Sequence, residues 1–228
     1  MKVLVVDVGG THVKVLATGA TVRRAFESGP SMTAAKMVKQ VRALTADWTY
    51  SAVSIGYPGV VVHGKIAAEP RNLGQGWLAF DFHKAFGVPV KLVNDAAMQA
   101  LGSYEGGRMF FLGLGTGLGS AMVVDGDVES MELGHLPYKK GRTFEDYVGE
   151  HGRERLGKRK WRKEVAAVIE TFRAALEPDY IVLGGGNSPK VGRLPPGVRL
   201  GENTNAFAGG FLLWKAGGRI ARRGPKGR

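Results

Sequence analysis

Two glycine-rich turns, each set between two apolar, β-prone runs, constrain the fold of this chain more than any other feature. The first turn joins residues 3–6 to 13–17, and the second lies within 109–124, with glycine at 113, 115, 117 and 119. A turn with almost no side chains exposes successive backbone N–H groups, which form a concavity for a phosphate anion. Because the same device occurs twice, we expect two similar half-folds that face one cleft and each contribute a phosphate-binding hairpin.

A carboxylate follows an apolar strand at two points of the chain. Asp7 ends the first strand, and residues 90–93 deliver Asn94 and Asp95 at the start of a helical segment that reaches residue 104. A carboxylate beside a phosphate cradle indicates phosphoryl transfer to a hydroxyl, with Asp95 taking the proton. Asp7 is placed to hold a metal ion through water. The alternatives are that Asp95 is a helix N-cap and that each glycine hairpin is an ordinary tight turn.

The charge of the chain predicts a polyanionic partner. The 228 residues carry a formal net charge of +12, which favours nucleic acid, a membrane surface or a highly phosphorylated substrate. Each basic cluster can equally be a solvated face. The clusters are Lys139, Lys140 and Arg142; Arg153, Arg155, Lys158, Arg159, Lys160, Arg162 and Lys163; and Arg219, Arg222, Arg223, Lys226 and Arg228.

Several classes of protein are disfavoured by what the sequence lacks. Cysteine is absent, which excludes disulfides and thiolate metal sites and fits a reducing compartment. No apolar run approaches the roughly 18–20 residues of a membrane span, and the chain leads directly into a strand, so we expect a cytoplasmic protein without a signal peptide. The P-loop pattern does not occur, and Leu118 breaks the dinucleotide-binding register that would follow Gly113 and Gly115.

The remaining pattern predicts alternating helices and strands. Periodicity and breakers indicate helices at 31–44, 80–86, 160–176 and 204–214, strands at 53–55, 61–66 and 180–183, an extended connector at 194–200, and a disordered tail from 216. A polar, glycine-punctuated loop at 70–77 contains Asn72, which is either a turn residue or a hydrogen-bonding ligand contact.

Glu132 and His135 stand three residues apart, the spacing of metal ligands on a helix. Gly134 and Pro137 favour a loop instead, and no further His or Cys stands at ligand spacing, so we expect hydrogen bonds to hydroxyls and no zinc. Glu145 follows near a predicted helix start, where a first-turn residue interacting with the helix dipole is the alternative.

Taken together, five segments resemble the motif series of ROK-family sugar kinases, members of the actin/hexokinase-like superfamily. They span nearly the whole chain in the order of the family, so the match is far more specific than any single loop. The segments are residues 7–11, 92–95, 114–119, 132–135 and 183–186.

The resemblance implies an α/β fold with two actin/hexokinase-like (ribonuclease H-like) domains around a central cleft. The expected small domain is 1–93 plus 205–228, with a returning C-terminal helix and basic tail, and the large domain is 94–204. Asp95 is the expected base and Mg²⁺ the expected metal, anchored by Asp7. We also expect a homodimer without a specific nucleic-acid or membrane partner. The expected sugar contacts are Asn94, Glu132, His135 and Glu145, to which Asn72 is added. The expected phosphate contacts are Gly9, Gly10, Thr11, Gly115, Thr116, Gly117 and Gly119, together with Gly185 from a third glycine turn at 184–187.

The chain departs from the family pattern in two places. Typical members carry a cysteine-rich zinc site where this chain has residues 139–145, a segment similar to the zinc-free polyphosphate glucokinase branch. The span from Gly119 to Gly184 is short, which trims the helices that usually build an adenosine pocket. We therefore expect a kinase that phosphorylates the 6-hydroxyl of glucose from polyphosphate, with ATP as a further possible donor.

Three alternatives remain open at the level of the sequence. A strictly ATP-dependent hexokinase is supported by the turn at 184–186, which resembles an adenosine-binding loop. A sugar-binding regulator on the same fold is disfavoured by Asp95 and by the absence of an added N-terminal helix-turn-helix. A nucleic-acid binder would be drawn by charge alone.

Overall fold

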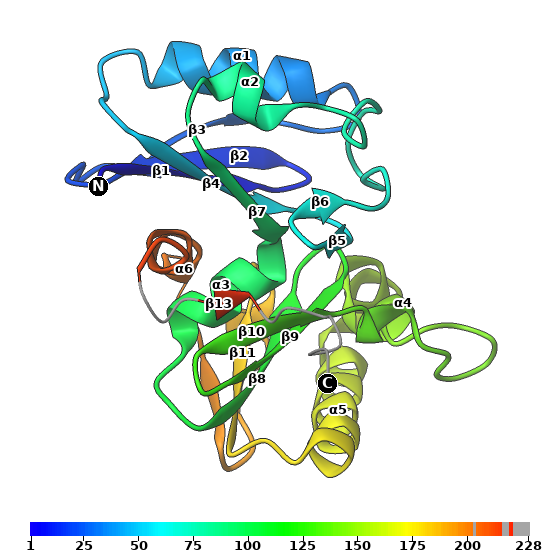
Figure 1. Ribbon diagram of the computed structural model, residues 1–228. Coiled ribbons are helices and arrows are strands. Elements are labelled where there is room, and N and C mark those ends of the chain that lie inside the picture. Colours follow the sequence, from blue (N-terminus) through cyan, green and yellow to red (C-terminus); the bar gives the residue numbers. More distant parts are fainter. Residues whose placement is uncertain (203, 216–218, 221–228) are drawn as a thin grey trace, which may run out of the picture.

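The computed structural model describes residues 1–202, 204–215 and 219–220. Five layers follow one another in Figure 1: the pair α1 and α2, a first sheet, the pair α3 and α6, a second sheet, and α4 with α5. The helices are α1 (Ala34–Leu44), α2 (Phe82–Phe86), α3 (Asp95–Ser103), α4 (Glu145–Val148), α5 (Glu150–Leu176) and α6 (Asn205–Leu212).

The first sheet has the strand order β3-β2-β1-β4-β7. Strands β1, β2 and β3 are antiparallel neighbours, whereas β4 and β7 run parallel to β1. The small hairpin of β5 and β6 stands apart from this sheet. The strands are β1 (Val3–Val8), β2 (His12–Ala17), β3 (Arg24–Glu27), β4 (Ala52–Tyr57), β5 (Val61–Val62), β6 (Lys65–Ile66) and β7 (Val90–Asn94).

The second sheet has the order β12-β11-β8-β9-β10-β13 and repeats the topology of the first. Here β8, β9 and β10 are antiparallel neighbours, and β11 and β12 run parallel to β8. This is the relation of β1, β2, β3, β4 and β7, so the internal repeat expected from the two glycine hairpins is confirmed. The strands are β8 (Arg108–Leu114), β9 (Leu118–Val124), β10 (Asp127–Met131), β11 (Tyr180–Gly184), β12 (Val198–Leu200) and β13 (Arg219–Ile220).

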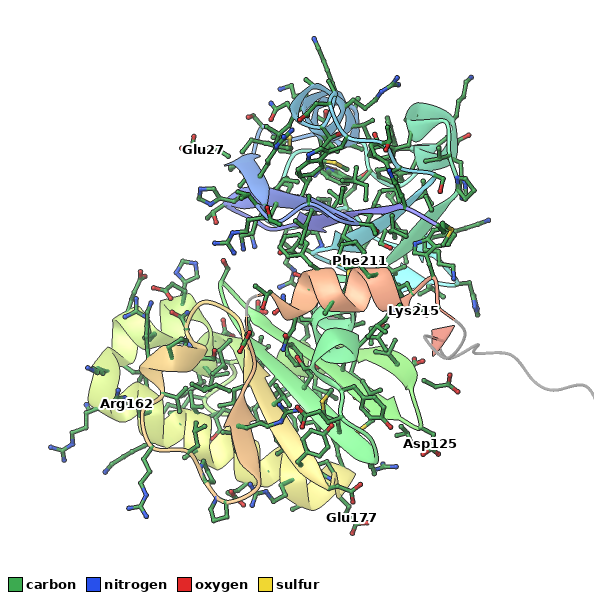
Figure 2. The ribbon with its side chains drawn as sticks, turned by 90° about the vertical axis from the view of Figure 1, so that its left-hand side faces the viewer. Glu27, Asp125, Arg162, Glu177, Phe211 and Lys215 are labelled. Atoms are coloured by element: carbon green, nitrogen blue, oxygen red, sulfur yellow. The ribbon has the colours of Figure 1, made fainter. Side chains whose placement is uncertain are left out.

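The helices α3 and α6 occupy equivalent places in the two halves and cross at glycines. A Cβ on Gly102 would collide with the carbonyl oxygen of Asn205, and one on Gly209 would collide with that of Met98. Such close approach requires residues without side chains. In Figure 2, α6 lies between the two halves, with Phe211 and Lys215 near its end.

The helix α6 packs on the first sheet, whereas α3 packs on both: its Met98 and Leu101 lie in the core that β1 shares with α6. In α6, the carbonyl of Gly210 accepts a hydrogen bond from Ser54 Oγ at 2.6 Å, and Phe207 shares a core with Val3 and Val5 of β1. The helix α3 also contributes Ala96 and other alanines to a core with the second sheet. The predicted domain boundaries at 93/94 and 204/205 stay a prediction.

Most predicted helices and strands are present, with shifted ends. Thr33 caps α1 and Asp81 caps α2, so these helices begin three and two residues later than predicted. The largest difference concerns α5, which begins at Glu150 and is kinked at Gly157, where φ is +72°. The predicted helix at 160–176 is the part after this kink.

Four strands were not predicted, and one predicted strand is divided. Residues 194–200 were expected to be a connector, but Val198–Leu200 forms β12. The strands β3 and β10 were missed. The run at 61–66 turns back on itself at His63 and Gly64, both with positive φ, to form the β5–β6 hairpin. Of the expected disordered tail, Arg219–Ile220 pairs with β10, whereas 216–218 and 221–228 lie outside the described residues.

Candidate active site

Asp95 lies at the first turn of α3, but it does not cap this helix. Asn94 is the N-cap: its Oδ1 accepts from Ala97 N at 3.1 Å, and its Nδ2 donates to the carbonyl oxygen of Gly59 at 3.0 Å. Asp95 Oδ1 accepts from the neighbouring Ala96 N at 2.8 Å. The alternative that Asp95 is the N-cap is therefore wrong, and its carboxylate takes no part in capping α3. Asn94, expected to contact the sugar, is almost fully buried and has both side-chain polar atoms engaged.

The protein around Asp95 disfavours its ionised form. Desolvation by burial is the main cause, the charge of Asp7 adds to it and that of Glu132 adds less, and together they raise the pKa of Asp95 to about 7. Asp7 belongs to the first half and Glu132 to the second, so negative charges from both halves act on Asp95. A base with a pKa near 7 is suited to accept a proton at neutral pH.

Asp7 stands at the end of β1, beside the first glycine turn. Burial raises its pKa, and the ammonium group of Lys14, 3.8 Å from Oδ2, acts in the opposite direction. The two residues are direct cross-strand partners in the β1–β2 hairpin. A single carboxylate of this kind fits Mg²⁺, which is commonly held by one or two carboxylates together with substrate phosphates.

The first glycine turn is closed by short backbone contacts. Gly9 N donates to the carbonyl oxygen of His12 at 2.9 Å, and Ser28 Oγ donates to that of Gly9 at 2.6 Å. Thr11 is exposed at the tip, and a Cβ on Gly10 would lie 3.3 Å from the Cβ of Asn72. The loop that carries Asn72 thus lies directly against the predicted phosphate turn.

The second glycine turn joins β8 to β9. Gly115 N donates to the carbonyl oxygen of Gly117 at 3.1 Å, and Thr116 is exposed between them. Gly119 lies within β9, where a Cβ would stand 2.8 Å from the Cβ of Ala96. Gly119 therefore has a packing reason to be glycine: it lets α3 approach the strand. Gly185 has φ of +81° and lies against the backbone of Leu114 at the end of β8.

The predicted sugar contacts of the second half form one cluster. Glu132 Oε2 lies 3.1 Å from His135 Nδ1 across the 3₁₀ turn η1 (Leu133–His135), and His135 Nε2 lies 4.0 Å from Glu145 Oε2. Burial raises the pKa of Glu132, opposed by His135. The predicted loop is thus a short 3₁₀ turn, too tight to be the α-helix that the metal-ligand alternative required.

Glu145 links this cluster to the second glycine turn. It is the first residue of α4, and its Oε2 accepts from Leu118 N at 3.0 Å. A Cβ on Gly117 would collide with its carboxylate. Glu145 Oε1 also lies 3.6 Å from Nη1 of Arg71, which reaches it from the first half.

Three features of the site escaped the sequence analysis. Arg71 neighbours Asn72 in an exposed loop, and no local signal marks its contact with Glu145. Lys14 was detectable, because a hairpin that turns at 9–11 places residue 14 opposite Asp7. The third feature, a group of charged side chains around Glu150 and Asn187, joins segments far apart in the sequence, so no spacing reveals it.

The basic residues of α5 line a groove at its kink. The groove has a volume of about 560 Å³ and is lined by Leu156, Gly157, Lys158, Arg159, Lys160 and Lys163. Gly157 opens it by interrupting the helix. Part of the predicted cluster at 153–163 is thus gathered at one concave surface.

Two kinds of feature were sought among the described residues: a cluster of metal ligands and a membrane-spanning helix. In residues 1–202, 204–215 and 219–220, no three His, Asp or Glu side chains gather as a metal-binding group. In the same residues, none of the helices combines the length and apolar character that crossing a membrane requires.

Comparison with known proteins identifies the class and then the family. The solved structure of an inorganic polyphosphate/ATP-glucomannokinase from Arthrobacter sp. strain KM superposes with a TM-score of 0.81, at 23% identity, over 92% of this chain and 97% of the other. A ROK family glucokinase from Streptomyces griseus, in complex with glucose and AMPPNP, gives 0.76 at 16% identity, over 92% and 98%. The fold is therefore the actin/hexokinase-like fold expected from the sequence.

The sequence itself matches the model of the ROK family over residues 3–154. This chain belongs to the ROK family. A relative from Mycobacterium tuberculosis (strain CDC 1551 / Oshkosh), named polyphosphate glucokinase, is 29% identical over 159 residues, which cover 63% of this chain. The matched part spans 59% of that relative.

Proposed function

We propose that this protein is a sugar kinase that transfers a phosphoryl group to the 6-hydroxyl of glucose. Inorganic polyphosphate is the proposed donor, and ATP is a further one. The name of the relative from Mycobacterium tuberculosis supports this assignment, as does family membership over residues 3–154.

The observation that carries the proposal is the state of Asp95. Because Asn94 caps α3, the Asp95 carboxylate takes no part in capping. It has a pKa of about 7 and feels the charges of carboxylates from both halves. In this role Asp95 takes the proton of the 6-hydroxyl as the oxygen attacks the terminal phosphorus of the donor, and the leaving phosphate keeps the bridging oxygen.

The sugar lies, in this proposal, against the cluster of Glu132, His135 and Glu145. Two carboxylates and an imidazole offer acceptors and donors to vicinal hydroxyls, and a site built to hydrogen-bond hydroxyls discriminates strongly against analogues without them. Because Glu145 already accepts from Leu118 N, it joins the sugar site to the glycine turn. Asn72 would complete the site from the first half.

The donor phosphates lie between the two glycine turns in this proposal. Backbone N–H groups of residues 9–11 and 115–117 are suited to cradle them. Mg²⁺ at Asp7 would neutralise charge on the transferring phosphate. The chain's own part in that is to present a buried carboxylate, with Lys14 beside it, at the mouth of the first turn.

The preference for polyphosphate is supported by charge. The net charge is +12, and the basic groove at the kink of α5 offers a polyanion several cations at one concave surface. A strictly ATP-dependent hexokinase is the second candidate. It is favoured by the third glycine turn, where Gly185 packs on Leu114 and which resembles an adenosine-binding loop.

A donor-by-sugar activity matrix tests the proposal. ATP, GTP and long-chain polyphosphate are each combined with glucose, mannose, fructose and N-acetylmannosamine, and the sugar phosphate is quantified. We expect glucose 6-phosphate from polyphosphate at a rate equal to or above that from ATP. Turnover with ATP and none with polyphosphate would leave the second candidate, and no turnover in any combination would refute the kinase. The homodimer stays a prediction.

A further inference from the structure

A compact group of charged and polar side chains lies beside the second glycine turn and has no part in the mechanism above. We name it the Glu150 cluster; its members are Glu150, Arg153, Asn187 and Lys190. Glu150 accepts from the guanidinium of Arg153, whose Nε lies 3.2 Å from Oε2, and from Asn187 Nδ2 at 2.5 Å. Asn187 Oδ1 accepts from Lys190 Nζ at 2.6 Å. Two cations thus converge on one carboxylate and one amide.

The Glu150 cluster is fixed to the turn that is expected to hold donor phosphates. The backbone N–H of Glu150 donates to the carbonyl oxygens of Gly115 and Thr116, both at 3.1 Å. Asn187 N donates to the carbonyl oxygen of Leu114 at 2.9 Å, and its Nδ2 also reaches that of Gly115 at 3.2 Å. Asn187 is buried. Any anion seated on Arg153 and Lys190 would therefore lie next to the turn at 114–117.

The charges of the cluster favour an anion with more charge than a carboxylate. The hydrogen bond from Arg153, then that from Asn187, then the charges of Arg153 and Lys190 lower the pKa of Glu150 to about 2. Glu150 is therefore ionised at neutral pH, and one negative charge faces two positive ones. A phosphate group of a polyanionic donor brings more negative charge and more acceptor oxygens than this carboxylate.

The ion pair that holds Glu150 is partly open to solvent, which lowers the cost of displacing Glu150 by a more highly charged anion. The side chain of Glu150 is 30% exposed and that of Arg153 is 29% exposed, so solvent reaches the ion pair. Ion pairs of this kind contribute about 0–1 kcal/mol. Lys190 is exposed and its backbone is held by Arg162 Nε, which donates to its carbonyl oxygen at 2.7 Å. The backbone that carries Lys190 is thus supported independently of Glu150.

We propose that Arg153 and Lys190 form a binding site for a phosphate group of the donor, distal to the transferred one, and that Glu150 occupies this site until the donor displaces it. This inference rests on the proposed function, because it assigns the place of the donor at that same site. Glu150 acts as an internal competitor that keeps the two cations neutralised when no donor is bound. It also weakens the binding of short anions, which have few other contacts with which to displace it.

Direct binding of inorganic tripolyphosphate to the full chain tests this inference without turnover. Dissociation constants are measured by titration calorimetry for the wild type, Glu150→Gln, Lys190→Gln and Glu170→Gln. Glu170 is the matched control, because it also forms an i,i+3 pair with an arginine on α5, at 3.7 Å from Arg173. We expect Glu150→Gln to bind about tenfold more tightly, which corresponds to about 1.4 kcal/mol, and Lys190→Gln to bind several-fold more weakly. Glu170→Gln should match the wild type.

The two proposals fail in different measurements. Equal dissociation constants for Glu150→Gln and Glu170→Gln, or wild-type affinity in Lys190→Gln, would overturn the donor site, whatever the enzyme's activity. Lys190 is exposed, so its variant keeps the test open even if Glu150→Gln does not fold. The absence of sugar phosphate in the activity matrix would instead refute the kinase and leave an anion site of unassigned purpose.

Discussion

Replacing Asp95 with asparagine should separate activity from stability, because the carboxylate that is needed for proton transfer is also a burden on the folded protein. Asparagine keeps the acceptor for Ala96 N but cannot take a hydroxyl proton. We expect turnover to fall by roughly 10²–10⁴, the usual contribution of a positioned general base. Sugar affinity should change much less.

The magnitude of the stability effect follows from the pKa of Asp95. This pKa is raised from 3.8 to about 7 in the folded protein. The folded form of such a carboxyl group binds its proton more tightly than the unfolded form, so the native state loses stability as pH rises from about 3.8 to about 7. At about 1.36 kcal/mol per pKa unit, the full penalty above pH 7 has an upper limit of about 4 kcal/mol.

Asp95→Asn should therefore be more stable than the wild type at pH 8 and gain less at pH 5. Urea unfolding at both pH values measures this difference, and a coupled assay for glucose 6-phosphate measures turnover. In the wild type, turnover should also fall as pH drops below about 7, because the base becomes protonated. The reasoning is wrong if the variant keeps near wild-type turnover, or if its gain in stability is the same at both pH values.

Three further predictions concern the metal, the donor and the helix crossing. Activity should require Mg²⁺ and be abolished by EDTA, and elemental analysis should find no stoichiometric zinc, since charge on the transferring phosphates needs a cation. The apparent KM for long polyphosphate should rise more steeply with salt than that for ATP, because more counterions are released. Replacing the four basic residues of the kink groove with glutamine should flatten that slope; they are Lys158, Arg159, Lys160 and Lys163. Gly102→Ala should destabilise the protein by about 1–3 kcal/mol, because its Cβ would collide with α6.

Each of these three predictions has its own control or contradicting result. One zinc per chain would contradict the assignment of His135 to the sugar. An unchanged salt slope in the fourfold glutamine variant would remove the kink groove from donor binding. Ala208→Ser adds one atom at an exposed position of α6, beside the crossing, and should leave stability nearly unchanged; an equal loss in both variants would show that the crossing is not the cause.

Local patterns predicted the parts of the fold that depend on short segments. The two glycine hairpins and their carboxylates were visible because the strands are apolar and the turns are glycine. The β9–β10 hairpin was missed although its signal is present: Asp125 and Gly126 both have positive φ and form a two-residue turn of the kind that Asp-Gly favours. The strand β12 was missed because Pro195 and Pro196 precede it and suggested a connector.

Long-range features of the site could not be predicted. Asp95 and Asn94 are adjacent, and only the path of the backbone decides that Asn94 caps the helix while Asp95 does not. The reach of Arg71 to Glu145 depends on how the two halves face each other. The Glu150 cluster joins the start of α5 to the turn after β11, segments that spacing alone cannot bring together.

The crossing of α3 and α6 determines how far a rotation between the two halves would move Asp95. The helix α6 packs on the first sheet, the alanines of α3 face the second sheet, and Gly102 and Gly209 bring the two helix backbones into contact, so we treat this contact as the pivot. Asp95 lies seven residues before Gly102, an arm of about 10 Å at 1.5 Å per residue. A rotation of about 10° at this contact would shift Asp95 by about 2 Å relative to the half that carries Asp7, and a misplacement of about 1 Å is enough to cost about 10²-fold in rate. A small change in the angle between the halves would therefore change the reaction rate strongly.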